Sequence, residues 1–262
     1  LASIHASPEP AGCKHVYSAT AAPAWLTFRS RGGAAMLVFL FAGRLVPFDF
    51  SGEGVAHVAK LYFRFGAMNS GKSTALLQAA YNYEERGQRV LLAKPRVDTK
   101  GDALIVSRLG VTRHADFLIG PEDSAKDLFH AAAEVTEDPD RMHWHLPVSC
   151  LLVDEAQFLT SEQIDDLMRI AVLEDIPVLA YGIRTDFRTH AFPGSARLLE
   201  IAHTLEELKT ICRCGRKALF NGRTLDGKFI FDGDQVAIDG VHVGYESLCA
   251  TCYLEESGGA LS

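Results

Sequence analysis

The stretch that decides the fold is Gly66-Ala67-Met68-Asn69-Ser70-Gly71-Lys72-Ser73, which fits the pattern G-x4-G-K-[ST]. An apolar run, Leu61–Gly66, predicts a β-strand before it, and Lys72–Arg86 is typical of a helix after it. In that setting the loop's N–H groups face phosphate oxygens, the lysine reaches the β- and γ-phosphates, and the hydroxyl binds Mg²⁺. The pattern therefore predicts a nucleotide-binding P-loop rather than a glycine-rich turn with an exposed lysine.

Strand and helix patterns continue to alternate after the P-loop. Gly87 is a candidate C-cap for the first helix, and Thr160 is a candidate N-cap for a later one. The expected strands are Arg89–Lys94, Ser149–Val153 and Ile176–Tyr181, and the further helices are Glu122–Val135 and Ser161–Val172. Residues 96–120 show no regular pattern and predict a loop. This alternation predicts an α/β fold, a P-loop NTPase-like parallel sheet flanked by helices.

A pair of carboxylates ends the buried strand Leu151-Leu152-Val153. Asp154 holds the Walker B position, where a carboxylate binds Mg²⁺ directly or through water. Glu155 is then free to accept a proton from an attacking hydroxyl. The pair does not identify the acceptor, because Glu155 could activate water in an ATPase or a substrate hydroxyl in a kinase.

Four of the six cysteines form two close pairs near the C-terminus. Cys212-x-Cys214 and Cys249-x2-Cys252 can converge on one tetrahedral Zn²⁺ with four thiolate ligands. Such a site has no open position, so the zinc would be structural. Cys13 has no partner pattern, and Cys150 lies in a buried strand, where packing explains it.

Composition limits the classes of partner. The formal net charge is −7, so a general role in coating nucleic acid is disfavoured. No apolar stretch reaches the roughly 20 residues that a membrane-spanning helix needs. These properties indicate a cytoplasmic protein with neither a nucleic-acid nor a membrane partner.

The chain is expected to have three parts. Residues 1–57 are rich in Ala, Gly, Ser and Pro and predict a disordered or non-native N-terminal extension. Residues 58–205 form the P-loop α/β nucleotide-binding domain. Residues 206–262, which contain short strand-like pieces and the four paired cysteines, form a small zinc-binding domain.

Four segments in this order resemble type II thymidine kinases, the zinc-containing P-loop type, and their bacterial branch in particular. They are the P-loop, Asp154-Glu155-Ala156-Gln157-Phe158, Tyr181–Arg188 and the cysteine quartet. The resemblance covers roughly Lys60 to Leu254. It implies transfer of the γ-phosphate of ATP to the 5′-hydroxyl of thymidine, giving dTMP for nucleotide salvage and DNA synthesis, with Mg²⁺ and structural Zn²⁺. It also implies a homotetramer and feedback inhibition by dTTP.

The resemblance also implies roles for individual residues. Glu155 matches the catalytic base, and the stretch from Asp154 through Ala156 to Gln157 joins the P-loop in binding the nucleotide. Phe187 matches an aromatic residue near the thymine ring, unless it belongs to the core, and Tyr245 matches a tyrosine that contacts base or sugar, unless it only packs. Asp98–Lys100 matches a mobile loop on the nucleotide side. The segment Gln235–Gly240 matches the lasso that covers thymidine, through Val236, Ala237, Ile238 and Asp239.

Two departures and two rival functions remain open. Asp239 replaces a glycine usual in the lasso, and the family lacks a long N-terminal extension. A P-loop ATPase with a structural zinc module would show thymidine-independent hydrolysis of ATP, and a non-enzymatic zinc-ribbon module would not bind ATP.

Overall fold

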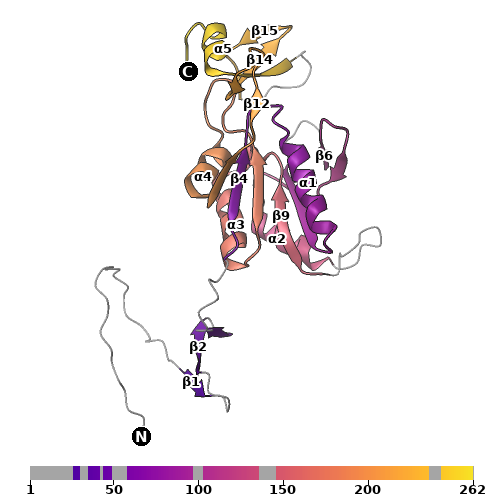
Figure 1. The fold of residues 1–262 in the computed structure, drawn as a ribbon, viewed down its shortest axis with the longest axis vertical. Helices are drawn as coiled ribbons and strands as arrows, with labels where there is room; N and C mark the ends of the chain where they lie inside the picture. The colour runs from indigo at the N-terminus through magenta and orange to yellow at the C-terminus, as the bar shows by residue number, and fades with distance from the viewer. Residues whose placement is uncertain are drawn as a thin grey trace, which may run out of the picture. The chain divides into compact units, whose positions relative to one another are not determined.

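A parallel sheet of six strands lies at the centre of residues 58–262, in the order β11-β4-β10-β9-β5-β8 (Figure 1). The computed structural model describes residues 58–96, 103–135, 146–235 and 243–261, and also the backbone of residues 26–29, 35–41 and 44–48. Every pairing within the central sheet is parallel. Its strands are β4 Leu61–Phe65, β5 Arg89–Pro95, β8 Phe117–Ile119, β9 Val148–Val153, β10 Val178–Gly182 and β11 Thr204–Glu207. The predicted α/β fold is confirmed.

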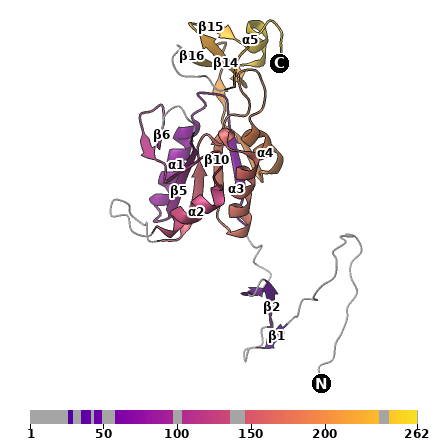
Figure 2. The ribbon, with the colours of Figure 1, turned by 180° about the vertical axis from the view of Figure 1, so that it is seen from behind.

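Helices cover both faces of this sheet because successive strand residues point to opposite sides. Leu91 and Ala93 face one cluster of buried side chains, whereas Val90 and Leu92 face the other. The first cluster packs against α2 Ala125–Glu134, α3 Ser161–Leu173 and α4 Pro193–Ile201, and the second against α1 Lys72–Glu84. Figure 2 shows α2 and α3 in front of the strands.

The predicted N-cap Thr160 is confirmed, whereas the predicted C-cap Gly87 lies two residues beyond the C-cap that the structure has, Glu85. Thr160 accepts a hydrogen bond from the backbone N–H of Gln163, whose side chain in turn accepts one from the N–H of Thr160. The first helix ends at Glu84, two residues earlier than expected, and Gly87 follows with a left-handed φ of 74°.

The loop predicted for residues 96–120 is partly wrong. β6 Leu104–Val106 and β7 Thr112–His114 form an antiparallel hairpin, and β8 adds an edge strand to the central sheet. Each of these strands has only three residues, which is too short to show an alternating pattern in the sequence.

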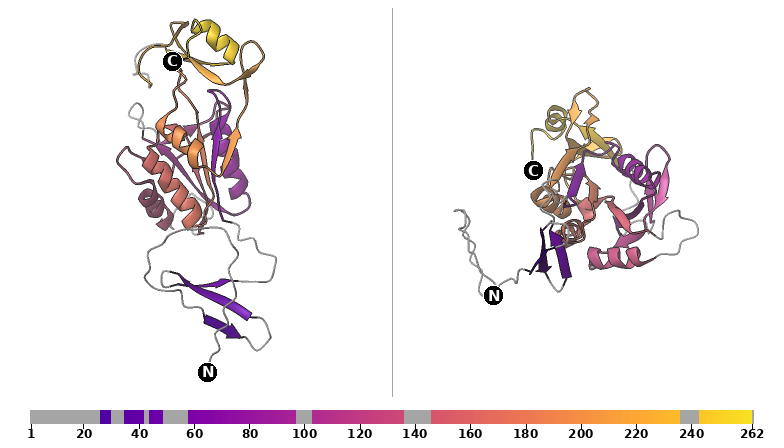
Figure 3. Two further views of the ribbon diagram at one scale, coloured as in Figure 1. Left: turned by 90° about the vertical axis from the view of Figure 1, so that its left-hand side faces the viewer. Right: turned by 60° about the horizontal axis from the view of Figure 1, so that its bottom comes forward.

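The segment after residue 205 adds small antiparallel sheets and a short helix at the end of the central sheet where the P-loop lies (Figures 1 and 3). β15, β14 and β16 form one sheet, and β12 pairs with β13. The elements are β12 Thr210–Ile211, β13 Lys217–Ala218, β14 Phe220–Leu225, β15 Lys228–Ile230, β16 Val243–Leu248 and α5 Ala250–Glu256.

The chain divides into two compact units, residues 1–57 and residues 58–262. In the first, β1 Leu26–Arg29, β2 Ala35–Phe41 and β3 Arg44–Phe48 form an antiparallel sheet in that order. The sequence showed no sustained strand pattern there, and the separate status of residues 1–57 stays a prediction. So does the division of the second unit at residue 205. Among the described residues, no helix combines the length and apolarity that crossing a bilayer requires.

Candidate active site

The P-loop joins β4 to α1 in a tightly folded turn. A methyl group added at Gly66 would lie 2.4 Å from the carbonyl oxygen of Leu208 and 2.4 Å from Ser70 Oγ, so any other residue would displace the loop. Asn69 adopts a left-handed φ of 67°, which asparagine tolerates better than most residues. The loop is therefore held in one shape by its neighbours as well as by its own sequence.

Lys72 begins α1, and its side chain folds back into this turn. Its Nζ donates hydrogen bonds to the carbonyl oxygens of Ala67 at 3.0 Å and Gly66 at 3.3 Å. Burial lowers the pKa of the Lys72 amino group, while the charges of Glu155 and Asp154 oppose that shift. The ammonium group thus lies against the loop, held by two of its carbonyl oxygens.

The carboxyl end of β9 brings Asp154 to the start of α1. Ser73 Oγ donates a hydrogen bond to Asp154 Oδ2 at 3.0 Å. Burial and the neighbouring Glu155 raise the pKa of Asp154 to about 6, against the opposing effects of Ser73 and Lys72. A hydroxyl and a carboxylate are hard oxygen ligands of the kind Mg²⁺ prefers, so this donor set fits that ion.

Glu155 has a backbone conformation that few non-glycine residues adopt. Its φ of 51° and ψ of 35° lie in the left-handed region, which turns the chain sharply after β9 into the short helix η1 Ala156–Phe158. Gln157 Nε2 donates a hydrogen bond to Glu155 Oε2, and Gln157 Oε1 accepts one from the backbone N–H of Ile183 at 3.2 Å. Gln157, only 1% exposed, therefore ties the Glu155 carboxylate to the end of β10.

One pocket of about 1250 Å³ connects these groups, enough space for more than one small molecule. The residues singled out from the sequence that line it are Met68, Asn69, Gly71, Lys72, Ser73, Glu155, Gln157, Phe187 and Tyr245. Five others, Gly66, Ala67, Ser70, Asp154 and Ala156, are not among its described lining residues and lie in or behind the loops that shape it. P-loop residues and Phe187 thus share one cavity although they are more than 100 positions apart.

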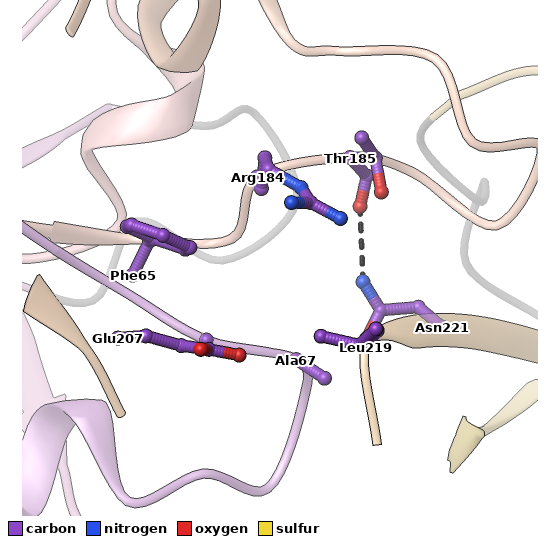
Figure 4. Close-up of a pocket in the computed structure, with 8 residues that line it drawn as sticks. Phe65, Ala67, Arg184, Thr185, Glu207, Leu219 and Asn221 are labelled. Atoms are coloured by element: carbon purple, nitrogen blue, oxygen red, sulfur yellow. Dashed lines mark hydrogen bonds between the residues drawn. The ribbon is translucent and has the colours of Figure 1, made fainter. Parts of the chain in front are cut away.

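Asn221 is a pocket residue that sequence reasoning missed. Its Oδ1 accepts a hydrogen bond from the N–H of Met68 at 2.7 Å, and its Nδ2 donates one to the carbonyl oxygen of Thr185 at 2.9 Å, as Figure 4 shows for the second bond. The crevice beside it holds about 10 Å³, room for one water molecule and not for a nucleotide. Asn221 thus joins the C-terminal segment to the P-loop.

Arg108 and Leu109 also line the pocket, from the turn between β6 and β7. The Ser107 hydroxyl closes this turn by accepting a hydrogen bond from the N–H of Val111 at 3.1 Å. The sequence offered no signal for this wall of the pocket beyond the prediction of a loop.

The four paired cysteines meet at a second place, away from the pocket. One ligand atom each from Cys212, Cys214, Cys249 and Cys252 lies within 4.8 Å of the others. Tetrahedral Zn²⁺ with bonds of about 2.3 Å would hold sulfurs about 3.8 Å apart, so the cluster fits that ion. The Cys252 N–H donates to Cys249 Sγ at 3.5 Å, the main reason that the pKa of Cys249 falls to about 6. Cys150, in contrast, is buried in β9, where burial raises its pKa to about 12.

Some predicted residues lie outside the described part of the chain. They are Cys13, the loop Asp98–Lys100 and the lasso residues Val236, Ala237, Ile238 and Asp239. Gln235, at the start of the lasso, is described and lines the pocket.

The family model and the curated relatives that match this chain name the same family. The family model described as "Thymidine kinase" matches residues 59–253. A thymidine kinase of Mesorhizobium japonicum is 48% identical over 205 residues, which are 78% of this chain and 95% of that protein. A thymidine kinase of Legionella pneumophila is 46% identical over 204 residues, 77% of this chain and 91% of that protein. Among solved structures, the pilus retraction motor PilT with bound ADP matches at a TM-score of 0.34 and 13% identity, covering 90% of this chain and 67% of that one.

Proposed function

The chain belongs to the thymidine kinase family, and on that basis we propose that it transfers the γ-phosphate of ATP to the 5′-hydroxyl of thymidine. The observation that supports this most directly is the shared pocket, in which Lys72 and Glu155 lie in one cavity with Phe187 and Tyr245. A phosphate donor and a nucleoside acceptor need such a cavity, because in-line transfer requires both in contact. The family membership does not favour the alternative of a P-loop ATPase with a zinc module.

The proposed mechanism assigns one task to each side chain. The N–H groups of Gly66–Ser73 and the Lys72 ammonium would bind the phosphates of ATP and stabilise the charge that develops on them. The Glu155 carboxylate would accept the proton of the 5′-hydroxyl, held in place by Gln157. Ser73 and Asp154 would hold Mg²⁺, which supplies charge neutralisation at the phosphates when bound.

The thymidine side of the pocket would be formed by Phe187, Tyr245 and the lasso. Phe187 is 1% exposed, yet it lines the cavity, so its ring would be held firmly and would offer an aromatic surface to a base. Stacking in a closed site would exclude water and limit hydrolysis of ATP. Structural Zn²⁺ on the cysteine quartet would fix the end of β16, the strand that carries Tyr245 and runs into Cys249.

Several finer features are proposed from the family resemblance alone. They are a homotetramer, feedback inhibition by dTTP and a cytoplasmic location. Light scattering on the purified protein tests the first, and inhibition of ATP-dependent phosphorylation by added dTTP tests the second.

The decisive experiment measures phosphate transfer from labelled ATP to each of the four deoxynucleosides and to water. We expect rapid transfer to thymidine, no more than slow hydrolysis without it, and little transfer to deoxyadenosine, deoxyguanosine or deoxycytidine. Hydrolysis at the same rate with and without thymidine would contradict the proposal and favour the ATPase. A parallel assay with deoxyuridine measures the contribution of the 5-methyl group.

A further inference from the structure

Arg223 is a buried cation that the proposed chemistry does not use. It lies on β14 and is 4% exposed. Burying a guanidinium is costly unless its donors and its charge are satisfied, so its surroundings indicate what it holds in place. Arg223 is not among the described residues that line the pocket, but both side chains proposed to contact the nucleoside lie against it.

The first contact is with Phe187. The guanidinium carbon lies 3.7 Å from the centre of the Phe187 ring, a close cation–π stack. Phe187 is held on another side by its backbone, because its carbonyl oxygen accepts a hydrogen bond from the Tyr253 hydroxyl at 2.7 Å. One face of the ring therefore rests on a planar cation, and the ring still reaches the pocket.

The second contact is with Tyr245, the residue directly opposite Arg223 in the antiparallel pairing of β14 with β16. Arg223 Nε donates a hydrogen bond to the Tyr245 hydroxyl at 3.2 Å. This bond leaves the hydroxyl free to donate its own proton to a ligand. It also limits the rotation of a side chain that is otherwise only partly buried.

The third contact is with the backbone where the lasso begins. Arg223 Nη1 donates to the carbonyl oxygen of Asp234 at 2.7 Å, and Nη2 donates to that of Gln235 at 2.8 Å. The Gln235 side chain in turn donates to Asp186 Oδ2 at 3.3 Å. The rigid fork of a single guanidinium thus fixes a ring, a hydroxyl and two successive carbonyl groups relative to one another.

We propose that Arg223 is the positioning residue of the nucleoside pocket, acting through Phe187, Tyr245 and residues 234–235 without touching thymidine. This inference rests on the proposed function of that pocket. A lysine at this position would keep the charge but could neither stack as a plane nor donate in three fixed directions. We therefore expect thymidine binding to need the guanidinium itself, and ATP binding not to depend on it.

The test compares Arg223→Met and Arg223→Lys with Arg197→Met in the full-length protein. Arg197 on α4 is the control, since it pairs with Asp165 and Glu200 but belongs neither to the described lining of the pocket nor to the cysteine cluster. Titration calorimetry gives the Kd for thymidine and for ATP, steady-state kinetics give the two KM values, and elemental analysis gives the zinc content. Wild-type protein is measured alongside.

Both Arg223 variants should raise the Kd and KM for thymidine by about tenfold or more, as expected for losing a stacked cation and its hydrogen bonds. Their Kd for ATP should change less than about twofold, and zinc content should match the wild type. Arg197→Met should leave both affinities unchanged. If Arg223→Met does not fold, Arg223→Lys decides the question.

Two outcomes would overturn the inference. Arg223→Lys with wild-type affinity for thymidine would show that the guanidinium geometry is not needed. Equal losses of thymidine and ATP affinity, or loss of zinc, would show that Arg223 only supports the fold. Failure of the wild-type protein itself to bind and phosphorylate thymidine would instead contradict the proposed function.

Discussion

Ser73 and Asp154 are 81 positions apart, yet the Ser73 hydroxyl donates a hydrogen bond of 3.0 Å to the Asp154 carboxylate. The bond joins the last residue of the P-loop, which lines the pocket, to the residue that follows β9, so the carboxylate lies directly behind the hydroxyl. Because β9 and α1 are both anchored in the core, the pair is set by the fold rather than by the flexibility of either side chain. This arrangement makes the two oxygens a candidate pair of ligands for one Mg²⁺ ion.

The first prediction tests that pairing. Ser73→Ala removes the hydroxyl and should raise the Mg²⁺ concentration needed for half-maximal activity by about tenfold, the effect of losing roughly 1.4 kcal/mol of binding. Ser73→Thr keeps the hydroxyl and is the matched control. Activity measured against Mg²⁺ at saturating ATP gives the answer, and an unchanged Mg²⁺ requirement in Ser73→Ala would remove Ser73 from the metal site.

The second prediction concerns the proposed base. Glu155→Gln should lower kcat by about 10²–10⁴-fold, because its amide cannot accept the proton of the 5′-hydroxyl. Binding of ATP should persist, since the P-loop is intact. Single-turnover assays and ATP titrations separate the two effects. Near-normal turnover in this variant would exclude Glu155 as the base.

The third prediction concerns the stacking ring and the tyrosine. Phe187→Ala should raise the KM for thymidine about 5- to 150-fold, corresponding to a stacking energy of about 1–3 kcal/mol, with little change in the KM for ATP. Tyr245→Phe should have a smaller effect, about 0.5–1.5 kcal/mol, because it loses one hydroxyl and the bond from Arg223. A Phe187→Ala variant whose two KM values rise equally would assign the ring to the core alone.

Local patterns explain what the sequence could predict. The P-loop and the carboxylates after β9 follow from short motifs, and four of the six central strands, β4, β5, β9 and β10, follow from apolar runs. The edge strands β8 and β11 were not predicted, because they are short and only partly buried. The contacts made by Asn221 and Arg223 could not be predicted, because their partners are set by tertiary packing. Asn221 binds the backbone of Met68 from 153 positions away, and nothing in the residues around it marks that contact. Both side chains are buried on β14, so the groups that they bind show which parts of the site each of them holds in place.

The fourth prediction concerns the N-terminal residues. Every described residue that lines the pocket, and all four clustered cysteines, lie in the unit that begins at Val58. Protein that begins at Val58 should therefore fold and phosphorylate thymidine with the kcat and KM of the full chain. Circular dichroism and steady-state kinetics on both forms test this. Insoluble or inactive shortened protein would show that residues 1–57 contribute to the fold or to assembly.

The fifth prediction is that the cysteine cluster stabilises the P-loop. β14 and β16 lie in the chain between the two cysteine pairs, and both strands bind Met68: Asn221 accepts from its N–H, and the Ser247 hydroxyl donates to its carbonyl oxygen. If zinc holds the ends of this segment together, the metal would also stabilise the P-loop.

Purified protein should accordingly contain about one Zn²⁺ per chain, and Cys249→Ser should lose it. The variant should unfold at a lower temperature and exchange the Met68 amide proton faster, because its acceptor on Asn221 is no longer fixed. Its KM for ATP should rise as a result. Cys150→Ser is the control, since that cysteine is buried in β9, distant from the cluster in the chain, and its replacement should leave the zinc content unchanged. Metal-free protein that stays folded, protects Met68 and turns over normally would show that the quartet does not support the P-loop.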